Sequence, residues 1–428
     1  MSTWRSPTLA LIGVAGILVA IVAVAVLSRY QGGPATPKSA TPPTVGSSPA
    51  QTSTSTVPSA VWVAPTIGPA FHETLPVVYT GQNLSVPGWS PDGSRFAVID
   101  AAQSGSGPMP PTWTVHMFDR NGAAVATVDA AKFAWVDSNH YVILRFAQSE
   151  GSPGSGAYRA YFGLVGSISL NSLGVCDWLV AGPSGAVALM LPWDGTITSP
   201  PQYVVVDSNG AMSGPRSGYP ISWSRDGSAL AVIHPNLATP SGFGGSAMGW
   251  VEVVGPSGQS IAAARDVEAG TMMPAAAFSP DGMRVAFRDD TAAATKGEQI
   301  GVLDIGSGRL NEISGFGPFT WGTNDKLLFA DLSVYSWSAT SRELSVYGTG
   351  TIVGASGSGL VVIGTETSSD LSVSTLIDST SGTQPPLTLG AWPVGGIPDA
   401  AWSPGGRSLV VISGESGLTY ENAVLAQF

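Results

Sequence analysis

A ten-residue unit recurs along the chain and constrains the fold more than any other feature of the sequence. Its clearest copy is WSPDGSRFAV at residues 89–98, and related copies lie at residues 223–232, 278–287 and 402–411. In the clearest copy an aromatic residue precedes a turn in which proline presets one backbone angle, aspartate bonds to its own main chain and glycine takes the left-handed position. The apolar run that follows is typical of a strand buried between two sheets.

Weaker copies extend the series, and a second turn signal divides each unit. The weaker copies are centred on Trp135, Trp178 and Trp321, and residues 353–363 form a copy without the aromatic residue. A second hairpin signal, such as DRNG at residues 119–122, follows later in each unit. Two hairpins in about 45 residues give four strands, the make-up of a propeller blade. The sequence therefore predicts an all-β fold, a β-propeller of four-stranded blades, with eight blades by repeat count or seven if one weak copy is misread.

The last unit lacks one strand, and the start of the domain can supply it. After its aromatic residue this unit contains strand-like segments only near residues 409–413 and 422–427. We expect residues 76–80 to add the fourth strand and to close the ring. The aromatic residues that precede the turns are interpreted as core between blades rather than as a platform on which a ligand stacks.

The repeat resembles that of a known family of propellers. The pattern WSPDG-x-x-[FLV]-A-[VF] is similar to the TolB-type β-propeller repeat, which is related to the tryptophan–aspartate repeat propellers. The resemblance spans about residues 74–428, and four copies carry it. It implies a binding or scaffolding module, as in most such proteins, or the gating propeller of a serine peptidase. The repeated residues serve turns and blade packing, so the resemblance specifies fold more than function.

An apolar segment near the N-terminus predicts a membrane anchor. Residues 9–27, LALIGVAGILVAIVAVAVL, contain no charge and follow a short N-terminal tail at residues 1–8. A helix of this length nearly spans the hydrocarbon core, and it is longer than the core of a cleavable signal peptide. We therefore predict one transmembrane helix, an uncleaved signal anchor that contacts the lipid bilayer through residues 9–27.

A polar stalk follows the anchor. Residues 28–60 are rich in Pro, Ser and Thr, a composition that cannot bury enough apolar surface to fold. Positive charges flank both ends of the anchor and do not decide its orientation. The order of anchor, disordered stalk and propeller domain at residues 61–428 favours a single-pass cell-membrane protein. Its N-terminus is expected in the cytoplasm and its propeller on the extracytoplasmic side.

Charge and motif content exclude several classes of function. The net charge of −11 argues against a nucleic-acid partner, since duplex binding needs clustered Lys and Arg. The single cysteine, Cys176, excludes an intramolecular disulfide and is interpreted as a small buried hydrophobe. The four histidines lack metal-type spacing, and no G-x-S-x-G nucleophile elbow or calcium-loop spacing occurs. We predict no catalytic residues, no metal site and no cofactor.

Seven long irregular segments fall between the expected second and third strands of blades and so would emerge on one face. They are residues 101–112, 148–157, 192–201, 234–249, 289–299, 364–371 and 414–421. A ring of loops on a rigid scaffold forms a concave surface that is suited to binding. The candidate binding residues on this loop face are Trp193, Asp194, His234, Phe243, Asp289, Asp290, Glu366 and Glu415.

These observations predict a membrane-tethered extracytoplasmic β-propeller that is not an enzyme. It would act as a binding or scaffolding module for a protein, peptide or glycan partner. Acidic and aromatic loop residues would suit a basic peptide, a saccharide or a cation. The alternative is a propeller enzyme, a lyase or hydrolase, whose acidic loop residues act as acid and base at the tunnel mouth.

Overall fold

The computed structural model describes most of the chain from residue 76 onward. The described residues are 76–101, 113–147, 158–193, 200–236, 248–270, 276–289, 299–315, 317–331, 333–349, 351–356, 360–366, 371–378, 387–393, 399–414 and 421–427. The predicted anchor and stalk lie outside the described residues. No helix long and apolar enough to cross a membrane occurs among the residues described.

Five sheets each consist of four antiparallel strands that follow one another along the chain. The first two are β2 (Leu84–Trp89), β3 (Arg95–Asp100), β4 (Thr114–Asp119) and β5 (Ala124–Asp129), then β6 (Lys132–Trp135), β7 (His140–Phe146), β8 (Tyr158–Leu164) and β9 (Leu170–Cys176). The third is β10 (Trp178–Ala181), β11 (Val187–Met190), β12 (Gln202–Val206) and β13 (Arg216–Ser217). The others are β22 (Phe319–Trp321), β23 (Lys326–Asp331), β24 (Ser333–Ser338) and β25 (Leu344–Thr349), then β26 (Thr351–Ala355), β27 (Leu360–Glu366), β28 (Leu371–Asp378) and β29 (Leu387–Pro393).

Two further sheets depart from this plan. One has eight strands, β14 (Tyr219–Trp223), β15 (Leu230–Pro235), β16 (Met248–Val254), β17 (Ser260–Gly270), β18 (Ala276–Phe278), β19 (Arg284–Asp289), β20 (Gln299–Asp304) and β21 (Leu310–Ser314). Its two four-stranded halves are joined by one pairing, Ala269 with Asp289. The other takes β1 (Val77–Gly81) from the start of the domain and β30 (Ala400–Trp402), β31 (Ser408–Gly414) and β32 (Glu421–Gln427) from its end.

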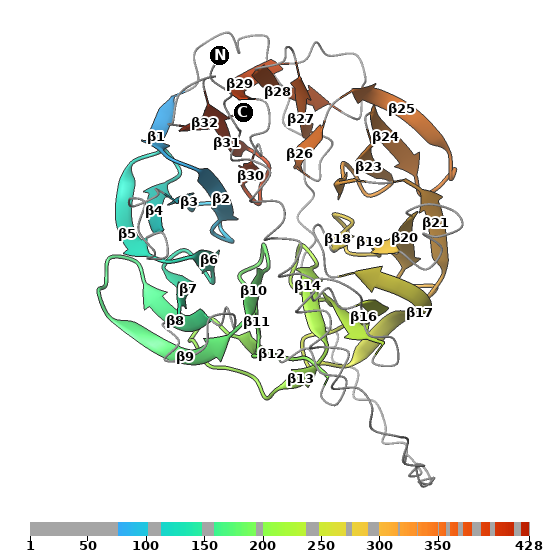
Figure 1. Ribbon diagram of the computed structural model, residues 1–428, viewed down its shortest axis with the longest axis horizontal. Helices are drawn as coiled ribbons and strands as arrows, with labels where there is room; N and C mark the ends of the chain where they lie inside the picture. The colour runs from blue at the N-terminus through green and yellow to red at the C-terminus, as the bar shows by residue number, and fades with distance from the viewer. Residues whose placement is uncertain are drawn as a thin grey trace, which may run out of the picture. The chain divides into compact units, whose positions relative to one another are not determined.

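The sheets are arranged around a centre as a β-propeller (Figure 1). The innermost strands are β2, β6, β10, β14, β18, β22, β26 and β30, and each contacts the next, with β30 contacting β2. The predicted all-β propeller of four-stranded blades is therefore confirmed. The predicted number of blades, eight or seven, needs correction, because among the described residues only five sheets are separate blades of four consecutive strands, while one residue pair joins two repeat units into an eight-stranded sheet.

The ring closes through the first and last strands. In the order β30-β31-β32-β1, β1 is the outermost strand and pairs antiparallel with β32, with Thr80 opposite Asn422. The Thr80 hydroxyl donates to the Asn422 side-chain oxygen at 2.7 Å. The prediction that residues 76–80 supply the missing fourth strand is confirmed.

A partly buried carboxyl group at the start of β30 contacts the neighbouring strand β2. Asp399 Oδ2 accepts a hydrogen bond from the Val86 main-chain nitrogen at 2.7 Å. Burial raises the pKa of Asp399, although hydrogen bonds from the amides of Val86 and Ala400 act in the opposite direction. The protonated carboxyl group is therefore favoured in the folded state more than in the unfolded state.

We expect Asp399→Asn to increase the free energy of unfolding at pH 7 and to leave it nearly unchanged at pH 3. A folded-state pKa above the unfolded one stabilises the protein below the unfolded pKa, and this contribution is lost as the pH rises through the folded pKa. Asparagine stays neutral and can still accept the Val86 hydrogen bond. Urea unfolding of both proteins across this pH range measures the difference, and parallel pH profiles would contradict the assignment.

The core lies between adjacent sheets, as the apolar runs of the repeat predict. Phe96 and Val98 of β3 are fully buried and pack in one cluster with Val410 and Leu425 of the closing sheet. Second and third strands are buried on both faces because a neighbouring sheet covers each face. The outermost strands face solvent, and Val125 of β5 is 40% exposed.

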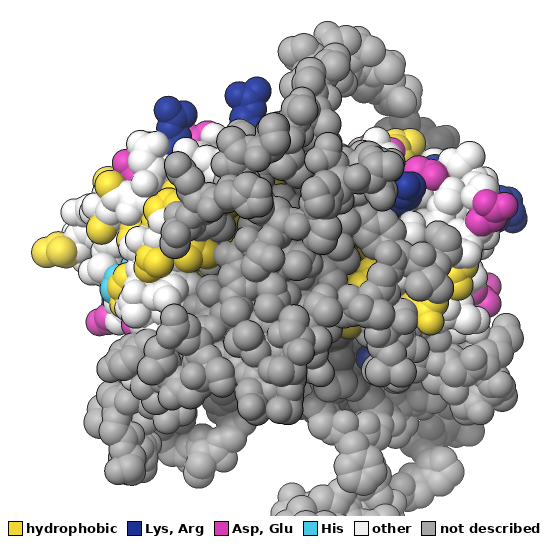
Figure 2. Space-filling model, turned by 90° about the horizontal axis from the view of Figure 1, so that it is seen from above, with side chains coloured by type: hydrophobic (Ala, Val, Ile, Leu, Met, Phe, Trp, Pro, Cys, Tyr) yellow, Lys and Arg dark blue, Asp and Glu magenta, His cyan; other side chains and the backbone are white. Residues whose placement is uncertain are grey.

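Among the described side chains of the surface in Figure 2, acidic and basic groups are dispersed rather than gathered by sign.

Four tryptophan side chains each link an innermost strand to the one before it. The indole Nε1 of Trp89 donates to the Ala401 carbonyl oxygen at 2.9 Å. Corresponding bonds, each from an indole to the preceding innermost strand, run from Trp135 to Gly88, Trp223 to Val180 and Trp321 to Ala277 at 3.3, 3.2 and 3.0 Å. The accepting residue is always one position before the end of its strand. We call the last residue of an innermost strand the anchor position, and its tryptophans serve as core between blades, as predicted.

One residue that the sequence placed at an anchor position, Trp178, does not lie there. Trp178 begins β10 rather than ending it, and Ala181 occupies the anchor position. A main-chain hydrogen bond closes the turn after Ala181, because Gly182 N donates to Ala186 O just as Val136 N donates to His140 O after Trp135. Trp178 was misassigned because β10 has only four residues, so an aromatic at its start lies close to the expected register. Its ring instead lies under the Lys132 ammonium, 4.4 Å from the nitrogen.

Candidate functional site

The structure describes the side chains of three of the eight candidate binding residues. These are Trp193, His234 and Asp289, whereas only the main chain of Glu366 is described, at the end of β27. The remaining candidates, Asp194, Phe243, Asp290 and Glu415, lie outside the described residues. The seven long segments do fall between second and third strands, as predicted. Because neighbouring strands are antiparallel, these connections lie at the opposite end of a blade from the turns that follow the anchors.

Each of the three described candidates contacts its own part of the propeller. The main-chain nitrogen of Trp193 donates to Asp177 Oδ2 at 2.8 Å. Asp289 is only 2% exposed, and its Oδ1 accepts from the Glu268 amide at 3.3 Å. These contacts do not bring Trp193 and Asp289 to a common site.

His234 belongs to a stacked cluster on the outer part of a blade. Its Nε2 lies 2.7 Å from Glu252 Oε2, and its ring stacks on Trp250 with centroids 4.2 Å apart. The Arg265 guanidinium lies 4.4 Å from the Trp250 ring centroid. The four side chains come from three neighbouring strands, β15 to β17, so they hold one sheet together at its surface.

Cys176 is a buried hydrophobe, as predicted. It is 1% exposed, and burial raises the pKa of its thiol to about 12, with a further contribution from Asp177. At neutral pH the thiolate that nucleophilic chemistry needs is scarcely formed. Among the residues that the structure describes, no group of three or more His, Cys, Asp and Glu side chains could hold a metal ion.

A cavity of about 410 Å³ lies where the innermost strands end. All eight innermost strands contribute lining residues, together with the turns after several of them. Five tryptophans line it: Trp89, Trp135, Trp223, Trp321 and Trp402. The three described candidate binding residues are not in the described lining. The cavity therefore lies at the turn end of the blades rather than at the loop face selected from the sequence.

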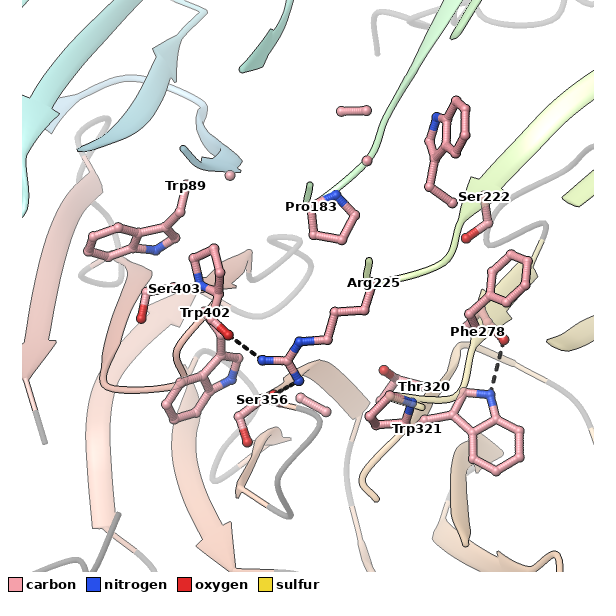
Figure 3. Close-up of a pocket in the computed structure, with 18 of the residues that line it drawn as sticks. Trp89, Pro183, Ser222, Arg225, Phe278, Thr320, Trp321, Ser356, Trp402 and Ser403 are labelled. Atoms are coloured by element: carbon pink, nitrogen blue, oxygen red, sulfur yellow. Dashed lines mark hydrogen bonds between the residues drawn. The ribbon is translucent and has the colours of Figure 1, made fainter. Parts of the chain in front are cut away.

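Arg225 is the one charged side chain among the described lining residues. It lies in the turn after β14, where the equivalent residue of three other repeats is proline: Pro91, Pro280 and Pro404. Its guanidinium donates to the Ser356 carbonyl oxygen at 3.3 Å and also to the Pro404 carbonyl oxygen. Figure 3 shows the side chain extending from its own turn toward those after β26 and β30. Burial lowers the pKa of the guanidinium, which nevertheless stays charged at neutral pH.

Sequence reasoning missed Arg225, although the signal was present. The repeat copy at residues 223–232 reads WSRDG where the clearest copy reads WSPDG. A charged residue at a turn position otherwise occupied by proline is the only polar departure at that position in the four clear copies. Its importance could be recognised only once the turns were known to surround a common cavity.

Comparisons with known proteins give no family. No family model matches the chain, and neither does any curated protein sequence. Similar solved structures include the β-propeller domain of the trilobed protease from Pyrococcus furiosus, with 11% identity, a TM-score of 0.46, and coverage of 71% of this chain and 99% of that one. TolB from Acinetobacter baumannii is 14% identical, with a TM-score of 0.30 and coverage of 68% and 78%. A prolyl endopeptidase structure is 13% identical, with a TM-score of 0.40 and coverage of 69% and 46%. These likenesses concern the fold alone.

Proposed function

We propose that the chain is an eight-bladed binding propeller whose ligand site is the central cavity at the turn end of the blades. The observation that carries this proposal is the cavity itself, with its five tryptophans and one arginine. Its volume, about 410 Å³, falls in the range of small-molecule and peptide side-chain pockets. The indoles pack mainly between blades and present small apolar surfaces to the cavity, while arginine offers directed hydrogen bonds.

Eight blades are supported by the order of contacts at the centre. Eight innermost strands contact one another in a closed series. Among the described residues one strand pairing, Ala269 with Asp289, joins the halves of the eight-stranded sheet. Each half has the four-stranded meander of the other sheets, so the two halves count as two blades.

The hydroxyl and carboxyl groups of the repeat favour binding over catalysis. Ser224 Oγ donates to Asp226 Oδ1 at 2.8 Å and accepts from the Ala229 amide at 2.9 Å. Burial raises the pKa of Asp226, but hydrogen bonds from Ser228 and Ser224 outweigh it and hold the pKa below its ordinary value. Ser224 is fully buried and Asp226 is hydrogen-bonded within the same turn, so both side chains stabilise the turn. The lyase or hydrolase alternative would have to use other residues.

The partner proposed here is a peptide segment of another protein, and the site of action is the extracytoplasmic face of a cell membrane. The second part rests on the sequence, in which the apolar segment at residues 9–27 and the polar stalk precede the propeller. A tethered propeller with an open central cavity would hold a partner close to the membrane.

We expect Thr320→Trp to weaken peptide binding by about tenfold or more, because an indole at this position would fill part of the cavity. Thr320 lies in β22 and lines the cavity, whereas Thr127 lies exposed in β5, so Thr127→Trp is the matched control. Peptides selected from a random library on the full-length chain in detergent provide the ligands, and fluorescence polarisation measures their affinity. Equal binding by both variants would place the site elsewhere, and cleavage of the peptides would favour the enzyme alternative.

A further inference from the structure

The described lining of the cavity contains a positive charge without a matching negative one. Arg225 is the only charged residue in the described lining, and its described hydrogen-bond acceptors are two main-chain carbonyl oxygens. The described contacts between basic and acidic side chains are His140 with Asp137, His234 with Glu252, and Arg284 with Asp304. Arg225 therefore lacks a carboxylate partner among the described residues. A partly buried cation that is balanced only by neutral acceptors is costly to maintain.

The turn itself does not require this arginine. Proline occupies the same position after β2, β18 and β30, so the turn forms without a long cationic side chain. Arg225 N donates no hydrogen bond among the described residues, so proline is compatible with its position as well. The side chain extends into the cavity and contacts the turns after two other strands (Figure 3). The turn therefore does not need the charged side chain, although partial burial of that charge in the cavity costs free energy.

The guanidinium has hydrogen-bonding capacity left for a ligand. It carries five N–H groups in a fixed planar fork, and the two carbonyl oxygens account for one on each terminal nitrogen. The Nε group and one further N–H on each terminal nitrogen have no described acceptor. A carboxylate adds charge–charge attraction and can accept two parallel N–H bonds from such a fork, which a single carbonyl oxygen does not offer. A carboxylate could therefore replace or supplement the two weaker contacts.

The surrounding lining favours an anion that is attached to an apolar group. Trp223 and Trp321 form apolar walls, and the lining residues Ser222 and Thr320 carry hydroxyl groups that can donate to an oxyanion. Apolar walls limit the access of water and so strengthen a charge-assisted bond. Two kinds of peptide group combine a carboxylate with an adjacent apolar side chain: a C-terminal residue, and an Asp or Glu next to an apolar residue.

We propose that the central cavity selects a peptide carboxylate, which Arg225 binds through its guanidinium. This inference rests on the proposed binding function and adds the chemical class of the ligand. Arg225 is then the residue that determines specificity, while the indoles supply apolar contact. The position that holds a turn-stiffening proline in the other three clear copies holds the ligand-binding arginine in this copy.

Matched small probes test the proposal on the full-length chain in detergent. N-acetylphenylalanine carries a terminal carboxylate, N-acetyl-aspartyl-phenylalaninamide carries a side-chain carboxylate, and N-acetylphenylalaninamide carries none. Titration calorimetry should show that one of the two acids binds about tenfold or more tightly than the neutral amide, as expected for a charge-assisted hydrogen bond. The acid that binds identifies the source of the carboxylate.

Three variants connect the preference to Arg225. Arg225→Gln and Arg225→Pro should remove the preference for acid, and the proline variant restores the residue that the other turns carry. Arg309→Gln removes an exposed arginine from the turn between β20 and β21 and should leave the preference intact. Equal affinity of wild type for acid and amide, or no binding of either acid at about 10 mM, would overturn the proposal. If the wild-type protein shows no preference for the acids while binding of the selected peptides still weakens in Thr320→Trp, the carboxylate assignment fails and the proposed binding function stands.

Discussion

Replacing Trp321 by alanine is expected to lower the free energy of unfolding by about 3–5 kcal/mol. Trp321 is 3% exposed and packs in one cluster with Phe329 and Trp337 of its own sheet and Ile300 of the preceding one. Its indole also donates to the Ala277 carbonyl oxygen across the boundary between β22 and β18. The substitution thus creates a cavity and removes a bond between blades. Equilibrium unfolding in urea, followed by circular dichroism, measures the loss.

Trp321→Phe separates these two contributions. Phenylalanine keeps most of the apolar contact but lacks the indole N–H, so a smaller loss of about 0.5–1.5 kcal/mol is expected. Phe278 shows that the anchor position accepts this side chain, since it ends β18 in the preceding repeat. A loss for Trp321→Phe as large as that for Trp321→Ala would mean that the hydrogen bond, rather than packing, dominates this boundary.

Deletion of residues 77–81 is expected to reduce stability strongly and to promote aggregation. The deletion removes β1 and leaves β32 as an unpaired edge, and exposed edges template pairing with other chains. It also uncovers Leu425, which is 2% exposed and belongs to the cluster at this seam. We expect a lower thermal midpoint and, by light scattering, larger species at equal concentration. An unchanged midpoint would contradict the role assigned to β1 in closing the ring.

A crosslink across the same seam should act in the opposite direction. Thr80 and Asn422 are paired in register, so Thr80→Cys with Asn422→Cys places two thiols opposite each other. The only native cysteine, Cys176, is buried and does not interfere. Because the bond would close a loop of most of the domain, oxidation is expected to stabilise it by about 2–4 kcal/mol. The same variant in reducing buffer serves as the control.

Local sequence signals predicted the units of the fold well. Ser90, Asp92 and Gly93 form the expected turn, because each residue type has one physical role there: Ser90 Oγ bonds Asp92 at 2.7 Å, and Gly93 takes a φ of +68°. The second hairpin signal is equally local, since Asp119 Oδ1 accepts from the amides of Asn121 and Ala123. Such contacts depend on residues two to five positions apart, so they are legible without the three-dimensional structure.

Features that depend on distant segments were predicted less well. Trp178 carries the right side chain but lies at the wrong end of β10, and only the turn hydrogen bonds show that Ala181 is the anchor. The pairing of Ala269 with Asp289 joins two repeat units, and no periodic pattern indicates it. Arg225 gains its role from carbonyl groups 131 and 179 positions away in sequence. Sequence reasoning therefore chose the loop face, where composition was unusual, over the cavity that the turns create together.

The pairing of β1 with β32 also determines how the propeller would respond to mechanical force. The first described strand of the chain is the strand that closes the ring, and Val77, at its start, is opposite Val424. A pulling force applied to the chain before Pro76 reaches the ring first at the start of β1, where the Leu425 amide donates to the Pro76 carbonyl oxygen and Val77 pairs with Val424. The hydrogen bonds of β1 would then break one after another from Val77 toward Gly81, before any other sheet carries the load. A force applied from the N-terminal side would therefore open the propeller at this seam while its other sheets stay folded.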